Sequence, residues 1–275
     1  AAEALCISQP AVSQAVKQLE KALNSQLFIR TQKGVRLTAE GELLFPYVER
    51  GIENLLDGER MLRRLVDLDM GEVRIGASDM TLQFYLLPHL ERFHGRYPNI
   101  KVMVSNAPTP ETIQSLYEGR IDFGVVSTPF DARPEVAVRP VKKIRNVFVA
   151  GSQYQSLKGK RLEYGALMDL PCIFLEKNTS TRRFMDQFLE ERGIFLEPEF
   201  ELATSDMVVQ FAMRNLGIGC VMDEFAREKI EAGELFELTF GERMPDREIC
   251  IVTDRKNPVS PAGERFLEVL GASGI

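Results

Sequence analysis

Histidine and cysteine are scarce in this chain, and their positions argue against a metal centre. The 275 residues include two histidines and four cysteines. His89 and His94 are five positions apart, whereas two metal ligands on one helix are typically four apart. The cysteines lie far apart without metal-ligand spacing, at Cys6, Cys172, Cys220 and Cys250. We therefore expect no metal and no cofactor, and we expect reduced thiols in a cytoplasmic protein.

Long apolar segments and the common catalytic motifs are missing as well. No run of apolar residues approaches the length that crosses a bilayer, and the first residues lack the basic-then-apolar pattern of an export signal. Gly76-Ala77-Ser78 is not part of a nucleophile elbow, and Gly217-Ile218-Gly219 lacks the third glycine of a dinucleotide-binding loop. With no catalytic residues to name, we expect neither an enzyme nor a membrane partner.

A polar and basic helix is predicted close to the first residue. Ser8 is a suitable N-cap, and Pro10 falls in the first turn, where a missing N–H is tolerated. One face is apolar, with Val12, Val16, Leu19 and Leu23 at three- and four-residue steps. The opposite face carries Pro10, Ser13, Gln14, Lys17 and Lys21. Short hydrogen-bonding side chains followed by cations suit a helix that reads base edges in a major groove, although an ordinary surface helix can share this pattern.

A basic hairpin is predicted next. Residues 27–37 read as two short strands around a turn at Lys33-Gly34, with cations at Arg30, Lys33 and Arg36. Between Ser13 and Arg36 there are five cations and one carboxylate, although the whole chain has a formal net charge of −6. A basic patch on an acidic protein is expected where only one face of the molecule meets nucleic-acid phosphates.

Together these segments resemble the winged helix-turn-helix domain of LysR-type transcriptional regulators. The resemblance rests on Ser8-Gln9-Pro10-Ala11-Val12-Ser13 with Leu19-Glu20, on Leu27-Phe28-Ile29-Arg30 and on Leu37-Thr38-Ala39-Glu40-Gly41. It implies that the major groove is contacted by Ser8, Gln9, Pro10, Ala11, Ser13, Gln14 and Lys17. It also implies that Arg30, Lys33 and Arg36 contact the DNA backbone or the minor groove. The chain begins without Met, inside what would be the family's second helix, so the first helix is expected to be missing.

A long helix is predicted from a cap at Thr38 to about Asp69. Its apolar stripe is roughly heptad-like, with Leu44, Val48, Ile52, Leu55, Leu62 and Val66. A helix of this length needs a partner to cover the stripe, and a dimeric coiled coil is the economical solution. Packing against the chain's own domains is the alternative. The resemblance implies pairing with a second copy, in a homodimer or homotetramer.

From Glu72 onward, strands and helices alternate in the α/β manner. One set occupies about 73–126 and a second about 146–222, before a returning strand at 248–252 and a helix at 261–270. On the residues alone this is an α/β region of one or two lobes, with candidate crossings near 140–145 and 243–247. The resemblance implies a two-lobed effector-binding domain similar to type 2 periplasmic binding proteins.

We accordingly predict three parts. They are a winged helix-turn-helix domain at 1–37, a linker and dimerisation helix at 38–70, and an effector-binding domain at 71–275. Within the last part, lobe I takes 71–141 and 247–275, and lobe II takes 142–246.

Loops that follow strands and precede helices are the candidate ligand site. In open α/β sheets, ligands bind beyond the carboxyl ends of strands, where helix N-termini offer free N–H groups. The residue pattern and the family resemblance together select Ser78, Asp79, Met80, Thr81, Thr109, Asn178, Thr179, Ser180 and Thr204. Plain N-capping explains each Ser or Thr equally well when taken singly. Helix N-termini favour an anion, Arg182 or Arg183 could supply a cation, and Asp79 favours a zwitterion, so the expected ligand is a small polar acid or an amino acid.

Together, the residue patterns and the family resemblance predict a transcription factor that binds double-stranded promoter DNA and responds to a small molecule between two lobes. RNA polymerase is an expected further partner. The alternative is a solute-binding protein that uses the same two-lobed fold to deliver a ligand to a transporter. A redox switch through Cys172 and Cys220, as some relatives use, is disfavoured because both cysteines have apolar neighbours.

Overall fold

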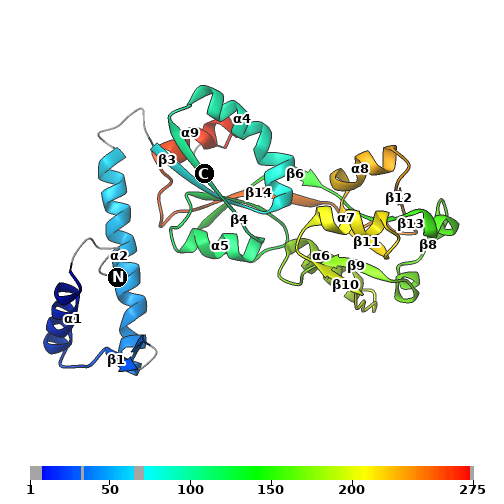
Figure 1. Ribbon diagram of the computed structural model, residues 1–275. Helices are drawn as coiled ribbons and strands as arrows, with labels where there is room; N and C mark the ends of the chain where they lie inside the picture. Colours follow the sequence, from blue (N-terminus) through cyan, green and yellow to red (C-terminus); the bar gives the residue numbers. More distant parts are fainter. Residues whose placement is uncertain (1–7, 32–33, 65–70, 273–275) are drawn as a thin grey trace. The chain divides into compact units, whose positions relative to one another are not determined.

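A computed structural model describes residues 8–31, 34–64 and 71–272 (Figure 1). The chain forms two compact units, Ala1–Arg63 and Arg64–Ile275. Among the helices of the described ranges, none is long and apolar enough to span a membrane.

The first unit begins with the predicted polar helix. Helix α1 (Gln9–Leu23) is capped by Ser8, whose hydroxyl accepts a hydrogen bond from the Ala11 amide, and it ends at Asn24 in the left-handed conformation. The antiparallel hairpin of β1 (Phe28–Thr31) and β2 (Gly34–Leu37) follows, with Phe28 opposite Leu37. The carboxylate of Glu20 accepts hydrogen bonds from the amides of Leu27 at 2.8 Å and Phe28 at 3.1 Å, so it fixes the start of the hairpin against α1.

The long helix α2 (Ala39–Arg64) begins where the sequence predicted. The hydroxyl of Thr38 accepts a hydrogen bond from the Gly41 amide at 3.0 Å, which is an N-cap contact. A Cβ atom at Gly41 would lie 2.3 Å from the carbonyl oxygen of Leu27, so only glycine allows this close approach of the helix to the hairpin. The last predicted residues of the helix, 65–70, lie outside the described residues.

The second unit contains two five-stranded sheets. The first has the strand order β4-β3-β5-β14-β6. Its strands are β3 (Gly71–Ala77), β4 (Ile100–Asn106), β5 (Phe123–Ser127), β6 (Val136–Ile144) and β14 (Arg247–Asp254). Strands β3, β4 and β5 are parallel, and β14 is antiparallel to both of its neighbours. In Figure 1, helices α4 (Leu87–Arg96) and α9 (Pro261–Val269) lie on one side of this sheet and α5 (Thr109–Tyr117) on the other.

The second sheet has the order β10-β9-β11-β7-β12. Its strands are β7 (Asn146–Ala150), β9 (Cys172–Leu175), β10 (Phe200–Leu202), β11 (Ile218–Met222) and β12 (Phe236–Glu237). The helices of this half are α6 (Ser180–Glu190), α7 (Ser205–Met213) and α8 (Asp223–Glu231). The 3₁₀ turns η2 (Ser152–Leu157) and η3 (Tyr164–Asp169) and the short parallel pair β8 (Arg161–Leu162) and β13 (Thr239–Phe240) complete it. We call the half that holds the first sheet lobe I and the half that holds the second sheet lobe II.

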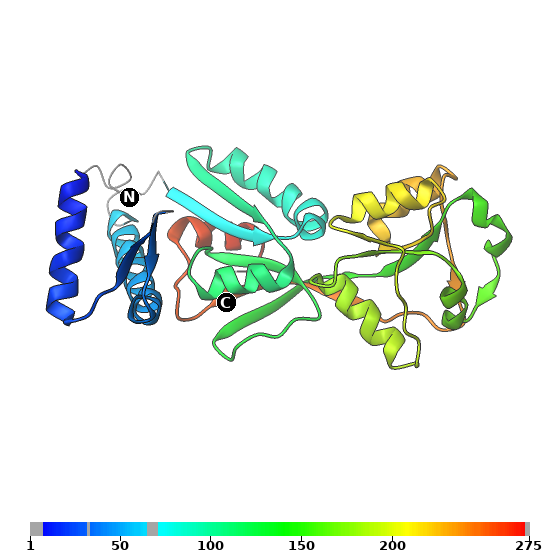
Figure 2. The ribbon, with the colours of Figure 1, turned by 60° about the horizontal axis from the view of Figure 1, so that its bottom comes forward.

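The chain passes twice between the two lobes, once from β6 into β7 and once into β14 (Figure 2). The first passage corrects a predicted boundary. Residues 142–144 were assigned to lobe II, but β6 stays paired with β14 as far as Ile144 opposite Arg247, so these residues belong to the first sheet. Pro140 is tolerated within β6, because β6 is an edge strand and its pairing with β14 shifts register at this point.

The helical segment before β4 is not one regular helix. It consists of a short turn α3 (Asp79–Thr81), a π-helical turn η1 (Leu82–Leu86) and then α4, which restarts with Pro88 in its first turn. Helix α8 was not predicted. Most of its residues are charged, and only Phe225 and Ala226 are buried, so its apolar periodicity is too weak to recognise.

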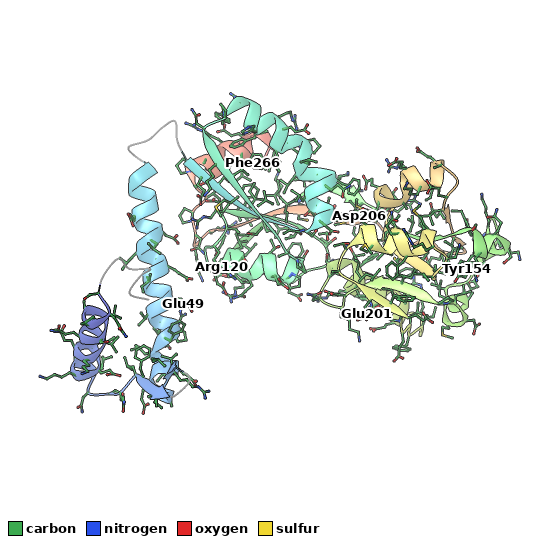
Figure 3. The ribbon with its side chains drawn as sticks, in the orientation of Figure 1. Glu49, Arg120, Tyr154, Glu201, Asp206 and Phe266 are labelled. Carbon is green, nitrogen blue, oxygen red and sulfur yellow. The ribbon has the colours of Figure 1, made fainter. Side chains whose placement is uncertain are left out.

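Apolar side chains fill the interior of both lobes. In lobe I, Phe266 is fully buried (Figure 3). Its ring centroid lies 4.6 Å from that of Phe93, in an edge-on arrangement, and 5.8 Å from that of Phe123. In lobe II, Phe148, Tyr164 and Phe240 form an aromatic cluster. Strands β5, β7, β9 and β11 are buried along their whole length, which explains why their sequences are almost entirely apolar; the exceptions are Ser127 at the end of β5 and Asn146 at the start of β7.

Candidate functional site

The face of α1 selected from the sequence is open to solvent. Six of the seven residues named there, Ser8, Gln9, Pro10, Ala11, Gln14 and Lys17, are exposed, and Ser13 is half-buried. Pro10 stands at the start of the helix and Lys17 two turns further along it, so hydrogen-bonding groups precede the cation in space as well as in sequence.

The hairpin presents a smaller part of the predicted basic surface. Arg36 on β2 is exposed, and Arg30 occupies β1 opposite Val35. Lys33 lies outside the described residues. The hairpin therefore carries an exposed Arg36 within the same compact unit as the polar helix.

Apolar side chains in the first unit are largely uncovered. No residue of α1 is buried, and Leu19 and Leu23 on its apolar face are 44% and 47% exposed. On α2, Leu44 is half-buried, whereas Val48, Ile52 and Leu55 of the predicted stripe are 43%, 52% and 76% exposed. Leu62 and Val66 of the stripe have side chains outside the described part of the structure. A helix with this much exposed apolar surface needs a covering partner.

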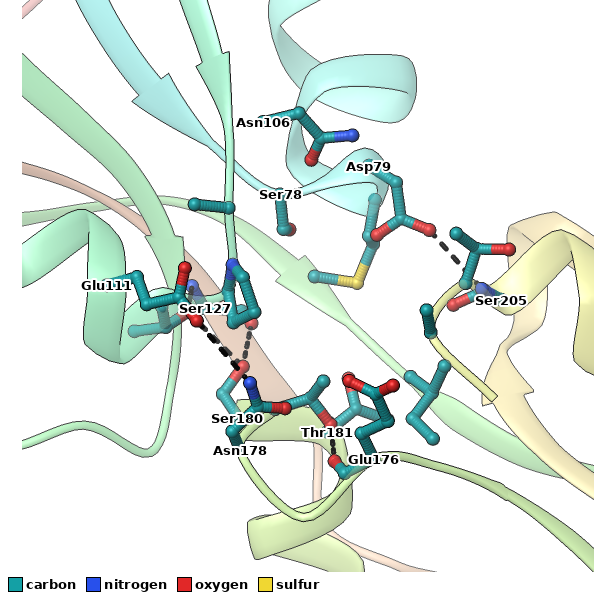
Figure 4. A pocket seen from close by; sticks show the side chains of 18 residues that line it. Ser78, Asp79, Asn106, Glu111, Ser127, Glu176, Asn178, Ser180, Thr181 and Ser205 are labelled. Carbon is teal, nitrogen blue, oxygen red and sulfur yellow. Dashed lines mark hydrogen bonds between the residues drawn. The ribbon is translucent and has the colours of Figure 1, made fainter. Parts of the chain in front are cut away.

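In the second unit, a cavity of about 290 Å³ lies between the lobes, at the carboxyl ends of β3, β4, β9 and β10 (Figure 4). Eight of the nine predicted residues line it, namely Ser78, Asp79, Met80, Thr109, Asn178, Thr179, Ser180 and Thr204. Helices α5, α6 and α7 all begin at this cavity, so their N–H-bearing ends converge on it. Its size is close to the lower limit of pockets that hold small molecules.

The ninth residue, Thr81, does not line the cavity, which corrects its assignment to the site. Its side chain is fully buried, and its hydroxyl donates a hydrogen bond to the Val125 carbonyl at 2.8 Å. The same hydroxyl accepts a hydrogen bond from the Ser78 amide at 2.9 Å, which completes a capping box with Ser78. Thr81 therefore fixes the loop that carries Ser78 and Asp79.

Hydroxyl groups join the two lobes across the floor of the cavity. The hydroxyl oxygens of Ser127 in lobe I and Ser180 in lobe II are 2.6 Å apart, and Thr109 donates to Ser180 at 3.4 Å. On another side, the Asp79 carboxylate of lobe I accepts a hydrogen bond from the Ser205 amide, at the start of α7, at 3.2 Å. At the cavity, the lobes are thus connected by polar contacts between groups that a ligand could also use. Elsewhere they also meet through apolar and ionic contacts, such as the edge-on packing of Phe84 on Phe225.

Several lining residues were not predicted. Ser127 and Ser205 are buried, and Glu111 and Glu176 are exposed at the rim. Glu176 follows directly from β9, so the strand-end rule that found Ser78 could have found it too. Glu111 lies within the first turn of α5, where the sequence alone does not show which way it faces.

Neither arginine expected to supply a cation does so. Arg182 is 3% exposed, and its guanidinium pairs with Asp186 and Glu201, each at 2.8 Å. Arg183 pairs with Asp131 at 2.9 Å and lines a different groove. Their ion pairs therefore hold both guanidinium groups away from the cavity.

A third arginine, Arg247, lies buried between the lobes. Its guanidinium donates to the Thr128 carbonyl at 2.8 Å, to Thr181 Oγ1 at 2.9 Å and to Asn146 Oδ1 at 3.0 Å. No described carboxylate pairs with it, and burial lowers the pKa of Arg247 to about 10. It begins β14 at a predicted crossing, where no local pattern indicates that a side chain is buried.

Comparison with known proteins identifies the chain. Residues 67–274 match the model of the LysR substrate binding domain, and residues 1–42 match that of the bacterial regulatory helix-turn-helix protein, lysR family. The chain belongs to the LysR family of transcriptional regulators. The first match covers most of the chain, and the second leaves the solute-binding alternative without support, because it places a DNA-binding domain before the two lobes.

Individual members are similar over nearly the whole length. This LysR-type regulator is 30% identical to a probable RuBisCO transcriptional regulator of Cyanidium caldarium, over 98% of this chain and 87% of the relative. A hydrogen-peroxide-bound cysteine mutant of OxyR from Corynebacterium glutamicum matches with a TM-score of 0.63 at 22% identity, over 98% of this chain and 85% of OxyR. The regulatory domain of Synechocystis CcmR, solved with 2-PG, matches with a TM-score of 0.66 at 19% identity, over 74% of this chain and 97% of the domain. The two structural likenesses concern the fold.

The thiols of the regulator's second unit are free and buried. Cys172 and Cys220 lie on the neighbouring strands β9 and β11, and burial raises the pKa of each to about 12. Burial likewise raises the pKa of Cys250 to about 11. Thiols that resist ionisation are poor nucleophiles, so their chemistry favours a packing role over a sensing role.

Proposed function

We propose that a small ligand bound in the cavity between the lobes controls how this LysR-type regulator engages promoter DNA. The observation that carries the proposal is the set of inter-lobe contacts at Ser127, Ser180 and Asp79, all of which line the cavity. A ligand that replaces these contacts binds one arrangement of the lobes better than another. Such a difference in affinity is what ligand control of a protein requires.

For DNA, we propose that α1 enters the major groove. Gln9, Gln14 and Lys17 are exposed on one helix, which begins with the N-terminal groups suited to base edges and phosphates. The remaining groove contacts in the proposal are Ser8, Pro10, Ala11 and Ser13. Arg30, Lys33 and Arg36 of the hairpin are proposed to neutralise backbone phosphates or enter the minor groove.

For assembly, we propose that α2 pairs with α2 of a second copy. The exposed side chains of Val48, Ile52 and Leu55 supply the apolar surface, and a homodimer or a homotetramer would cover it. Two copies also present two recognition helices, which lengthens the DNA sequence that is read. We place the assembly at promoters in the cytoplasm, with RNA polymerase as a further partner.

Footprinting on the DNA upstream of the regulator's own gene tests this proposal. We expect the full-length protein to protect two half-sites on one face of the duplex, with binding that weakens steeply as salt rises. Gln14→Ala should reduce protection of the half-sites, while Gln155→Ala on η2 serves as the matched control in the second unit. Absence of protection at low salt by a folded protein would contradict the DNA-binding part of the proposal.

A further inference from the structure

The cavity between the lobes has an unbalanced charge. Its lining contains three carboxylates, Asp79, Glu111 and Glu176, and no lysine, arginine or histidine. Figure 4 shows these three side chains on different sides of the cavity, with Asp79 and Glu176 facing each other across it. A ligand that enters therefore meets negative charge from more than one direction.

The cations nearest in the chain are held elsewhere. Arg182 and Arg183 are paired with carboxylates that do not line the cavity, namely Asp186, Glu201 and Asp131. Lys177 lines the neighbouring groove and not this cavity. Arg247 is buried behind Thr181, whose hydroxyl it contacts.

The three carboxylates lack an ionic partner within the described part of the chain. Asp79 accepts a hydrogen bond from the Ser205 amide at 3.2 Å, and Glu111 accepts one from the Asn178 amide nitrogen at 3.5 Å. Burial and the nearby charge of Asp79 raise the pKa of Asp206 on α7, a further sign of crowded negative charge. A cation placed among these groups would relieve the repulsion.

The opposite chemistry is found at the first turn of α6. The Thr179 hydroxyl satisfies the Arg182 amide, whereas the amides of Ser180 and Thr181 have no partner among the described residues. These free N–H groups lie beside the hydroxyls of Ser180, Ser127 and Thr109. Free amides at a helix N-terminus, together with hydroxyl donors, form a site for a carboxylate.

We propose that the cavity selects a small ligand that carries both a carboxylate and a cationic nitrogen, which is the charge pattern of an α-amino acid. The carboxylate meets the amides of Ser180 and Thr181, and the ammonium group meets Asp79 and Glu176. This inference rests on the proposed function of the cavity as the effector site. A purely anionic ligand of the same size would satisfy α6 but would face the carboxylates without compensation.

Calorimetric titration of the full chain with matched pairs of probes tests the inference. Each pair consists of an L-amino acid and its 2-hydroxy acid, such as aspartate with malate, alanine with lactate, and phenylalanine with phenyllactate. We expect at least one amino acid to bind and its hydroxy acid to bind about tenfold more weakly or worse, because a charge-assisted hydrogen bond is lost. The inference is overturned if a hydroxy acid binds as tightly as its amino acid, or if no amino acid of the standard twenty binds.

Charge-removing variants locate the ammonium group. Glu176→Gln and Asp79→Asn should each weaken the amino acid by about tenfold and leave the hydroxy acid unchanged or tighter. Glu176 is exposed at the rim, so its substitution does not endanger folding, and Glu190→Gln at the far end of α6 is the matched control. Equal affinity of the amino acid for Glu176→Gln, Asp79→Asn and the unaltered chain would overturn the assignment.

The same titrations separate failure of the inference from failure of the proposed function. Ser180→Ala removes a donor that both classes of probe would use. If a hydroxy acid binds best and Ser180→Ala weakens it, the cavity remains the effector site and only the ammonium assignment is wrong. If binding of every probe is insensitive to Ser180, Asp79 and Glu176 alike, the cavity is not the effector site.

Discussion

The two units of this regulator bury their apolar residues to very different extents. In the second unit, whole strands are buried and Phe266, Phe123 and Phe93 are fully enclosed. In the first unit, α1 has no buried residue, and Leu43 and Leu55 on α2 are 73% and 76% exposed. The second unit therefore contains its own core, whereas the first presents exposed apolar surface. The proposed ligand control and the proposed assembly thus depend on structurally different parts of one chain.

The largest effect is expected from emptying the core of the second unit. Phe266→Ala should lower the free energy of unfolding of this unit by about 3–5 kcal/mol, because it removes a buried ring and leaves a cavity. Urea unfolding followed by circular dichroism measures the change. Phe195→Ala, at a ring that is 72% exposed, is the control and should stay within about 0.5 kcal/mol. Equal losses for both variants would remove the distinction between a self-contained core and an open surface.

A smaller but still large effect is expected from charging the stripe on α2. Leu55→Glu should raise the dissociation constant of the dimer by at least about 30-fold, as expected for a residue at the centre of an interface. Analytical ultracentrifugation over a concentration series measures it, with Glu49→Gln on the same helix as control (Figure 3). The unfolding free energy of the second unit should not change. An unaltered dissociation constant would place the contact between copies somewhere other than the stripe.

At the DNA, a moderate and specific effect is expected. Lys17→Ala should weaken binding several-fold and lower the slope of log K against log salt by about 1, if its ammonium group neutralises one phosphate. Fluorescence anisotropy on a labelled duplex at several salt concentrations measures the slope. Lys160→Ala, at an exposed turn of the second unit, should leave the slope unchanged. A slope unaffected by Lys17→Ala would exclude Lys17 from phosphate contact.

The smallest effect is expected from thiol reagents. At pH 8 only on the order of 10⁻⁴ of a thiol with a pKa of about 12 is ionised, so Cys172 and Cys220 should not react with Ellman's reagent in the folded chain. The pKa of each thiol is raised by folding, so unfolding should restore ordinary reactivity at the same pH. The titration is made on Cys6→Ser, so that only Cys172, Cys220 and Cys250 are counted. Rapid reaction of any of these three before unfolding would reopen the redox alternative.

Local sequence rules predicted much of this architecture. Features that depend on a few consecutive residues were recognisable. They include the helix caps at Ser8 and Thr38 and the strand-to-helix loops at Ser78 and Ser180. The family resemblance supplied the pairing of the lobes, which no local pattern contains.

The charge of the cavity could not be predicted in the same way. Arg182 and Glu176 are six residues apart, yet one side chain is buried against Glu201 and the other lines the cavity. A charged residue such as Arg247 is ordinarily expected at the surface. It is instead enclosed by residues from distant segments, namely Thr128, Asn146 and Thr181. Which charges meet is decided by tertiary contacts, and the sequence specifies those only through the complete fold.

The position of β14 has a consequence for synthesis of the chain. This strand lies between β5 and β6 and pairs with both, although its residues, Arg247–Asp254, follow every strand of lobe II in the sequence. During translation, lobe II emerges complete while lobe I still has a gap in its sheet. Lobe I can complete its sheet only after residues 247–254 have left the ribosome, so lobe II has all of its own strands available before lobe I does.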